Sequence, residues 1–132
     1  FFAYFAIFFS TFFVTNFMNP IEQLTNKIIK FRDERDWKQF HNPKDVALSL
    51  VLEAGEVMEH FQWKSKEEIE KYVQTSKGDI GEELADVMYW VLLMSYDLDI
   101  DILDALENKI KKNKEKYPIE KAKGKHTKYN KL

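Results

Sequence analysis

The sequence contains no cysteine, and it has only four glycines and three prolines. The absence of cysteine excludes disulfide scaffolds, thiolate metal sites and cysteine nucleophiles. It is compatible with a reducing compartment, where disulfides rarely persist, and we expect a cytoplasmic protein. The scarcity of glycine and proline disfavours an all-β protein, because such folds need many tight turns.

Length and charge set further bounds. The chain has 132 residues, which favours a single domain. Hydrophobic residues make up 45% and charged residues 32%, a balance that allows a globular core. The formal net charge is -2. The chain as a whole therefore does not attract nucleic acid by charge, and we expect no nucleic-acid partner.

Residues 1–17 form a phenylalanine-rich hydrophobic extension without charge. One interpretation is a membrane anchor, but the stretch is at the short limit for a span, and no Lys or Arg precedes it. A second is a signal peptide, but the basic start and the cleavage site are missing. The third, which we favour, is an extension outside the functional domain, with the working protein starting near Met18. We therefore expect membrane association only if residues 1–17 form a real anchor.

From Asn19 onward, apolar residues recur at helical spacing, and no segment alternates with the period of a strand. Helix starts are marked by Pro or by capping residues, and helix ends by Gly or Pro. These signals predict a helix from Asn19–Pro20 to about Arg35–Gln39, a second opening at Asn42–Pro43, a short third from Ser65 to Thr75, a long helix over Asp79–Leu98, and a last helix from Asp99–Asp101 to just before Tyr117–Pro118. The predicted fold class is all-α, a bundle of four main helices plus a short one. It occupies residues 18–121, and residues 122–132 form a Lys-rich tail.

Two acidic pairs have the spacing i,i+3: Glu53 with Glu56, and Glu83 with Asp86. Side chains three residues apart project from the same side of a helix. Glu53 and Glu83 also fall within the apolar stripes of their helices, which include Val46, Leu50, Val57 and Phe61 on one helix and Ile80, Val87, Trp90 and Met94 on the other. This register predicts that the acids point into the bundle.

Carboxylates gathered inside a bundle need a compensating cation, because burial and mutual repulsion both disfavour their charged forms. Ligation by oxygen alone selects Mg²⁺ or Mn²⁺ over zinc. A di-iron site is disfavoured, since it needs Glu-x-x-His and none of His41, His60 and His126 lies three residues after a Glu. The alternative is that each acidic pair belongs to an ordinary solvated helix face.

Several segments together resemble one family. They are Phe31–Pro43 with its Arg-Asp-Trp core, Glu53–Glu56 leading to Phe61–Trp63, Glu82–Val87, and Asn113 ahead of Tyr117–Pro118. Their order and spacing resemble the MazG-like all-α NTP pyrophosphohydrolases, with the dCTP pyrophosphatase branch most similar. The likeness covers nearly all of the chain from Asn19 to Tyr129 and includes no counterpart of residues 1–17.

The resemblance implies an activity and a metal site. Family members hydrolyse a nucleoside triphosphate between the α and β phosphates, releasing the monophosphate and pyrophosphate. Carried over, Glu53, Glu56, Glu83 and Asp86 would be both the Mg²⁺ ligands and the catalytic set. One of them would act as a base toward the attacking water, with Glu56 a candidate. The expected substrate is dCTP or a related or modified deoxynucleotide, removed as nucleotide-pool housecleaning.

The resemblance also implies a substrate pocket. Trp37, His41 and Trp63 are similar to the family's base-pocket residues, and Trp90 lies where it would line the sugar. On the last helix, the expected phosphate or sugar contacts are Lys109, Asn113, Lys116 and Tyr117, with Lys112 and Lys114 as further candidates. The ordinary alternatives are core packing for the tryptophans and a solvated face for the lysines.

Other functions stay open on the sequence alone. A phosphoribosyl-ATP pyrophosphohydrolase of the same superfamily is one alternative, but the Trp37, His41 and Trp63 set argues against it. A non-enzymatic helical module with a Lys-rich tail is another, and the acids on apolar faces argue against that. Wide apolar faces, and the dimers or dimers of dimers that the resemblance implies, predict a homodimer or homotetramer.

Overall fold

The computed structural model describes residues 18–131, and within this range every regular element is a helix. The all-α prediction is therefore confirmed. The elements in order are α1 (Pro20–Asp33), the 3₁₀ turn η1 (Trp37–Phe40), α2 (Pro43–Glu59), α3 (Lys66–Thr75), α4 (Lys77–Asp97), α5 (Ile102–Lys116), α6 (Ile119–Ala122) and η2 (Tyr129–Lys131). The expectation for residues 1–17 lies outside the described residues.

Side-chain caps fix where several of these helices begin. Asn19 and Glu22 form a capping box at the start of α1, and Ser65 and Glu68 form another at the start of α3. The side chain of Asn42 accepts hydrogen bonds from two backbone N–H groups of α2. Each of these caps satisfies N–H groups that the helix itself cannot pair. The capping pattern in the sequence thus located these starts correctly.

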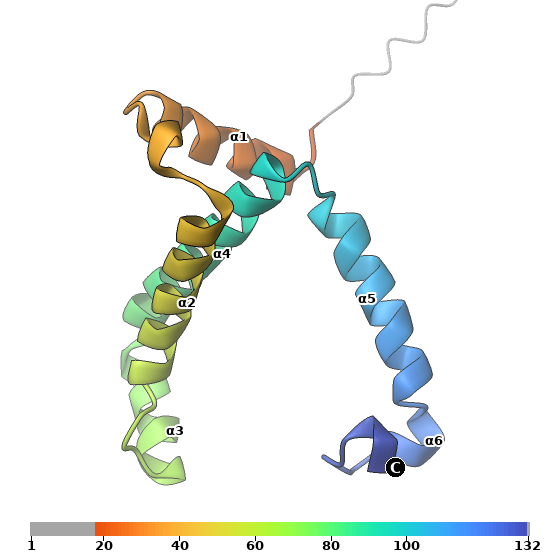
Figure 1. The fold of residues 1–132 in the computed structure, drawn as a ribbon. Coiled ribbons are helices and arrows are strands. Elements are labelled where there is room, and N and C mark those ends of the chain that lie inside the picture. The colour runs from red at the N-terminus through yellow and green to blue at the C-terminus, as the bar shows by residue number, and fades with distance from the viewer. Residues whose placement is uncertain (1–17, 132) are drawn as a thin grey trace, which may run out of the picture.

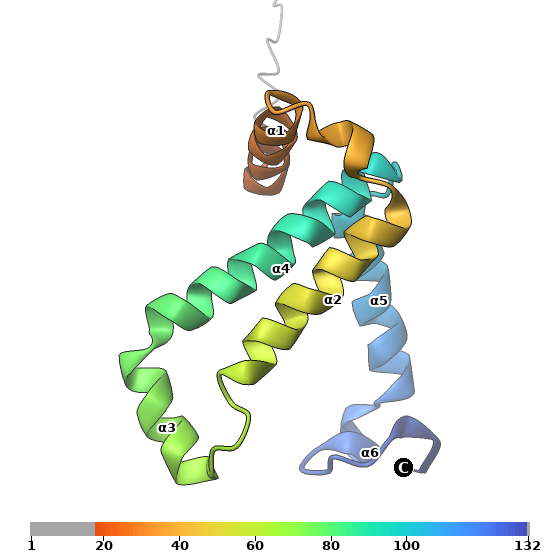
Figure 2. The same cartoon turned by 60° about the vertical axis from the view of Figure 1, so that its left-hand side comes forward.

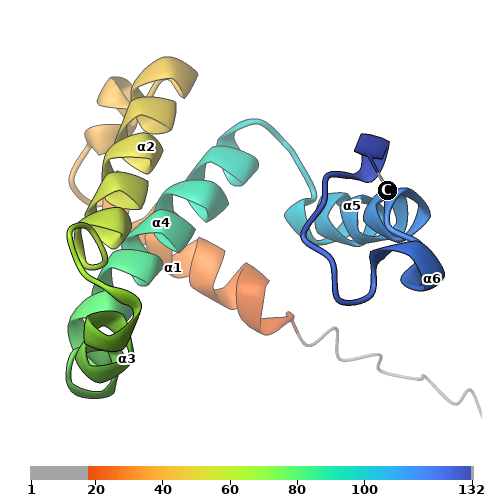
Figure 3. The same cartoon turned by 90° about the horizontal axis from the view of Figure 1, so that it is seen from below.

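The central feature of the fold is an antiparallel pair formed by α2 and α4, with the short α3 at their connecting end (Figures 1 and 2). α1 packs across the C-terminal end of α4. In contrast, α5 runs away from the α2/α4 pair and ends beside α6 and η2 (Figures 1 and 3). The catalytic candidates on α2 and α4 therefore face each other, whereas the substrate-contact candidates on α5 lie elsewhere.

The core of the single chain is small. Within residues 18–131 the buried apolar side chains are Val46, Leu92 and Leu93. Many apolar side chains on three helices are exposed, including Leu48, Val51 and Leu52 on α2, Leu84 and Met88 on α4, and Leu103, Leu106 and Ile110 on α5. Exposed apolar surface of this extent marks a contact surface. One copy of the chain thus leaves the sides of its helices uncovered.

Helix boundaries differ from the sequence expectation at three places. α1 ends at Asp33, because Asp36 adopts a left-handed backbone with φ 53° and η1 follows. α4 begins at Lys77, so Ser76 alone separates it from α3, and Gly78 lies inside the first turn. The helical turn α6 was not predicted. Among the helices described from residue 18 onward, none combines the length and apolar character needed to cross a membrane.

Candidate active site

Three of the four predicted acids meet where α2 and α4 run side by side. Carboxylate oxygens of Glu53, Glu56 and Glu83 all lie within 4.8 Å of one another. Glu53 and Glu83 are half-buried, and Glu56 is exposed. The antiparallel pairing explains the meeting, since it brings Glu53 and Glu56 of α2 opposite Glu83 of α4, which lies 30 and 27 positions later in the sequence. We call Glu53, Glu56 and Glu83 the acidic cluster.

Asp86, the fourth predicted acid, is exposed and lies outside the acidic cluster, although its charge acts on Glu83. The register predicted deeper burial than the structure shows for Glu53 and Glu83. The reason is that the predicted bundle interior is not closed in one chain, because α5 does not cover the α2/α4 pair.

The electrostatics of the acidic cluster favour a bound cation. Desolvation raises the pKa of Glu83 above its ordinary value, and the charges of Glu56, Asp86 and Glu53 raise it further. His60 acts in the opposite direction and lowers it. A carboxyl whose charged form is opposed in this way gains from a nearby positive charge. The donor set is three carboxylates with no sulfur, which fits a hard divalent ion such as Mg²⁺.

An aromatic wall adjoins the acidic cluster on the side of η1. The indole N–H of Trp90 donates a hydrogen bond to Glu53 Oε1 at 3.3 Å. The ring of His41 lies edge-on to Trp90, with the ring centroids 5.5 Å apart. His41 Nδ1 is buried and has no hydrogen-bond partner among the described residues. A buried polar atom without a partner is costly, so this nitrogen points to an additional group at the site. The structure thus brings Trp90 and His41 together beside the acidic cluster.

The other two predicted base-pocket residues are not brought together with this wall in one chain. Trp37 lies in η1 edge-on to Phe31, with ring centroids 5.8 Å apart, and Arg35 covers the Phe31 face. Trp63 lies beyond the far end of α2, is 93% exposed, and adopts a left-handed backbone with φ 66°. An exposed Trp in a strained conformation packs against nothing in this chain, so core packing does not explain it.

The predicted residues of α5 also lie apart from the acidic cluster. Lys109, Asn113 and Lys116 are exposed on a helix that runs away from α2 and α4 (Figure 1). Tyr117 lies edge-on to Tyr129, with ring centroids 6.0 Å apart, and the Lys116 amine is 5.0 Å from the Tyr129 centroid. These α5 residues contact the site only if another copy of the chain supplies them.

The structure also places three residues at the acidic cluster that the sequence analysis did not select. His60, Lys64 and Tyr72 line a pocket of about 250 Å³ together with Glu56, Glu59 and Glu83. A signal existed for His60, since it follows Glu56 by four residues, whereas Lys64 lies beyond the end of α2 in the turn that leads to α3. Tyr72 comes from α3, and its approach depends on the turn between α2 and α3.

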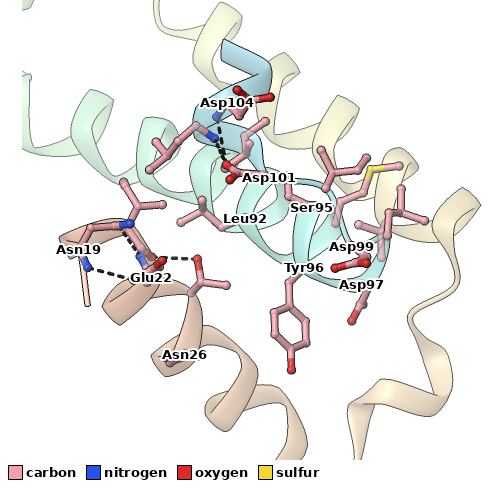
Figure 4. Close-up of a pocket in the computed structure, with 18 of the residues that line it drawn as sticks. Asn19, Glu22, Asn26, Leu92, Ser95, Tyr96, Asp97, Asp99, Asp101 and Asp104 are labelled. Carbon is pink, nitrogen blue, oxygen red and sulfur yellow. Dashed lines mark hydrogen bonds between the residues drawn. The ribbon is translucent and has the colours of Figure 1, made fainter. Parts of the chain in front are cut away.

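A larger hollow, of about 1300 Å³, lies between α1, the end of α4 and the start of α5 (Figure 4). It is acidic, but several of its carboxylates have structural partners. Glu22 caps α1, Asp101 accepts hydrogen bonds from backbone N–H groups of α5, and Asp97 pairs with Arg32. None of the acidic cluster lines it. We therefore assign the chemistry to the smaller pocket and the acidic cluster.

Comparison with known proteins identifies the family of the chain. The model of the MazG-like family matches residues 48–132. The dCTP pyrophosphatase 1 of Mus musculus is 33% identical over 114 residues, which cover 85% of this chain and 67% of that protein. The human protein of the same name is 32% identical, with the same two shares covered.

The fold is also found in a solved structure. A pyrophosphatase from Archaeoglobus fulgidus is 36% identical and superposes with a TM-score of 0.71. The match covers 74% of this chain and 92% of that one. The family model spans more than half of the sequence and includes all three residues of the acidic cluster. The chain therefore belongs to the MazG-like family.

Proposed function

We propose that this nucleoside-triphosphate pyrophosphatase uses Mg²⁺ to convert dCTP, or a related or modified deoxynucleotide, to the monophosphate and pyrophosphate. Its relatives from mouse and human are named dCTP pyrophosphatase 1, which supports the choice of substrate. The role would be housecleaning of the nucleotide pool in the cytoplasm. The observation that carries the proposal is the convergence of Glu53, Glu56 and Glu83 within 4.8 Å on two facing helices.

The residues divide the work of hydrolysis. Glu53, Glu56 and Glu83 would hold the ion, with Asp86 as a further ligand. The bound ion supplies neutralisation of the phosphate oxygens and activation of a water molecule. Trp90 holds the carboxylate of Glu53 in place through its indole N–H. Glu56, the exposed member of the acidic cluster, would take a proton from the attacking water. The water oxygen then bonds to phosphorus while the bond between that phosphorus and the α–β bridging oxygen breaks.

The nucleoside would lie on the aromatic side of the acidic cluster, against His41 and Trp90. Both rings can stack on a base, and the unpartnered His41 Nδ1 offers a polar contact to it. Trp37, Trp63 and the α5 residues Lys109, Asn113, Lys116 and Tyr117 would complete the pocket from a second copy of the chain. The exposed apolar side chains of α2, α4 and α5 support a homodimer or homotetramer as the working form.

A nucleotide panel tests the proposal. The full chain is incubated with each deoxynucleoside and nucleoside triphosphate, and with phosphoribosyl-ATP, in the presence of Mg²⁺. We expect a monophosphate and pyrophosphate in equal amounts, fastest for dCTP or a modified dCTP, and no turnover after chelation of the metal. Release of inorganic phosphate alone would contradict the proposed cleavage. Preferred turnover of phosphoribosyl-ATP would replace dCTP as the substrate.

A further inference from the structure

The pocket formed by His60, Lys64 and Tyr72 beside the acidic cluster has no assigned role. It measures about 250 Å³, and its lining is polar or charged throughout. His60 Nδ1 and the Tyr72 hydroxyl are 2.6 Å apart, a hydrogen bond that links the end of α2 to α3. The Lys64 amine lies 4.5 Å from the centroid of the Tyr72 ring. The side chains of His60 and Lys64 are therefore both held at the pocket by Tyr72.

The hydrogen bond to Tyr72 orients the His60 ring. Since Nδ1 is engaged by the hydroxyl, the Nε2 nitrogen is left to meet a ligand in the pocket. Lys64 adds a positive charge with three donors and no acceptor. Donors of this kind, next to carboxylates proposed to hold a divalent ion, are suited to the oxygens of phosphate groups.

The pocket and the aromatic wall lie at opposite ends of the acidic cluster. Along α2, Glu53 contacts Trp90, Glu56 follows, and His60 lies at the far end. With a rise of 1.5 Å per residue, His60 is about 10 Å beyond Glu53. α4 runs antiparallel, so Trp90 lies at the η1 end and Glu83 nearer to α3. The acidic cluster therefore separates an aromatic end from an end that carries His60 and Lys64.

We propose that His60, held by Tyr72 and assisted by Lys64, binds the β and γ phosphates of the substrate and the pyrophosphate product. The proposal rests on the proposed function and extends it to the polyphosphate end of the substrate. The nucleoside lies at the aromatic end, the scissile linkage lies at the acidic cluster, and the leaving pyrophosphate lies in the His60 pocket. This arrangement selects for a chain of phosphates whatever the base is.

The experiment measures pyrophosphate binding and not only turnover. Titration calorimetry with Mg²⁺ and inorganic pyrophosphate is carried out on the full chain and on its His60→Gln, Lys64→Met and Tyr72→Phe variants. A hydrogen bond to a charged group contributes enough that we expect about tenfold weaker binding for His60→Gln. Tyr72→Phe removes only the orienting hydroxyl, and we expect a smaller loss. In turnover, the variants should show a raised KM for the triphosphate and weaker inhibition by pyrophosphate.

Matched controls separate this role from a structural one. His126→Gln and Lys71→Met change the same residue types at exposed positions and should bind pyrophosphate like the unaltered chain. Inhibition by the nucleoside monophosphate should be the same in all variants, because that product lies at the aromatic end. Far-UV circular dichroism checks that each variant keeps its helices.

The two proposals fail in different ways. If the unaltered chain releases no pyrophosphate from any nucleotide, the proposed function is wrong, whatever the variants do. If it releases pyrophosphate but His60→Gln and Lys64→Met bind pyrophosphate normally, the His60 pocket is not the phosphate site. Equal weakening of pyrophosphate and monophosphate inhibition would also overturn the pocket, because it would show a general disturbance of the site.

Discussion

The guanidinium of Arg32 is fully buried and donates from Nη1 to both carboxylate oxygens of Asp97, at 2.7 and 2.8 Å. Its Nε also donates to Asp33 at 2.8 Å. Burial works against the charged guanidinium, but Asp97 and Asp33 outweigh it and raise the pKa of Arg32 above its ordinary value. This ion pair fastens α1 to the end of α4 and so helps to position η1 and His41, which follow α1 in the sequence.

Removing one partner of this pair should destabilise the chain strongly. Asp97→Asn leaves a buried positive charge with only Asp33 to balance it, and we expect a loss of about 3 kcal/mol in the free energy of unfolding. Urea denaturation followed by circular dichroism measures the loss. Lys30→Met, which breaks the exposed Lys30–Glu34 pair, should change stability by less than about 0.5 kcal/mol. Equal stability of the Asp97 variant and the unaltered chain would refute the structural role.

Neutralising one acid of the proposed metal site should abolish turnover without unfolding the chain. Glu53→Gln removes a ligand at the acidic cluster, and Asp86→Asn tests whether the acid outside the cluster also serves the ion. Steady-state rates in saturating Mg²⁺ are compared with helicity by circular dichroism. Glu70→Gln, at an exposed position of α3, is the control and should keep full activity. Wild-type rates for Glu53→Gln would rule out the metal assignment.

Glu83 should make the stability of the metal-free chain depend on pH. Its pKa in the folded state is raised above the ordinary value of 4.5, so the folded chain binds this proton more tightly than the unfolded chain does. The cost is absent below the unfolded pKa and grows as the pH rises from there to the folded pKa, after which it is constant. Glu83→Gln should therefore raise Tm at pH 7 and leave it unchanged near pH 3.

Added Mg²⁺ provides the contrast for that measurement. A ligand that binds only the folded state stabilises it, so Mg²⁺ should raise Tm of the unaltered chain more than that of Glu83→Gln. If the substitution lowers Tm at pH 7 without metal, the repulsion inferred for the acidic cluster is not present.

Trp63→Ala should change the choice of nucleotide without affecting stability. The side chain is 93% exposed in one chain, so its loss costs little burial. If Trp63 reaches the base of a substrate bound mainly by another copy, KM should rise and the preference among bases should weaken. Competition between paired nucleotides measures that preference. Unchanged preference in the variant would show that Trp63 is not part of a base pocket.

Leu106→Glu should separate the assembled form into single chains. Leu106 is 54% exposed on α5 and belongs to an apolar stripe with Leu103 and Ile110. A charge in a covered apolar interface is costly, so we expect a lower mass by sedimentation and a loss of activity. Glu107→Gln, the adjacent position on α5, is the matched control. An unchanged mass for Leu106→Glu would place the interface on another helix.

Features that depend on neighbouring residues were predicted from the sequence more fully than features that depend on long-range contacts. Caps such as Asn19 and Ser65 lie within a few residues of the groups they bind, so the sequence located those helix starts. The meeting of Glu53 with Glu83 followed from periodicity and family resemblance together. The family itself and the all-α class are confirmed by the comparisons and the structure.

The parts that the sequence did not predict depend on how elements are placed. The bond from Tyr72 to His60 is set by the turn between α2 and α3, which no periodicity describes. The burial of Arg32 is likewise invisible in a stripe pattern, because charged residues are assigned to the surface by default. The half-exposure of Glu53 depends on whether α5 covers its helix, and a single chain does not provide that cover.

The separation of α5 from the rest of the chain has a consequence for folding. A helix of 15 residues with few tertiary contacts is marginal in water, because nucleation is costly and packing supplies most helical stability. If α5 is covered only by another copy, its helicity is coupled to association and follows the law of mass action. Dilution would then melt α5 first, together with Lys109, Asn113 and Lys116, the residues proposed to contact the substrate. The concentration of the protein would thereby set the fraction of molecules that are competent for catalysis.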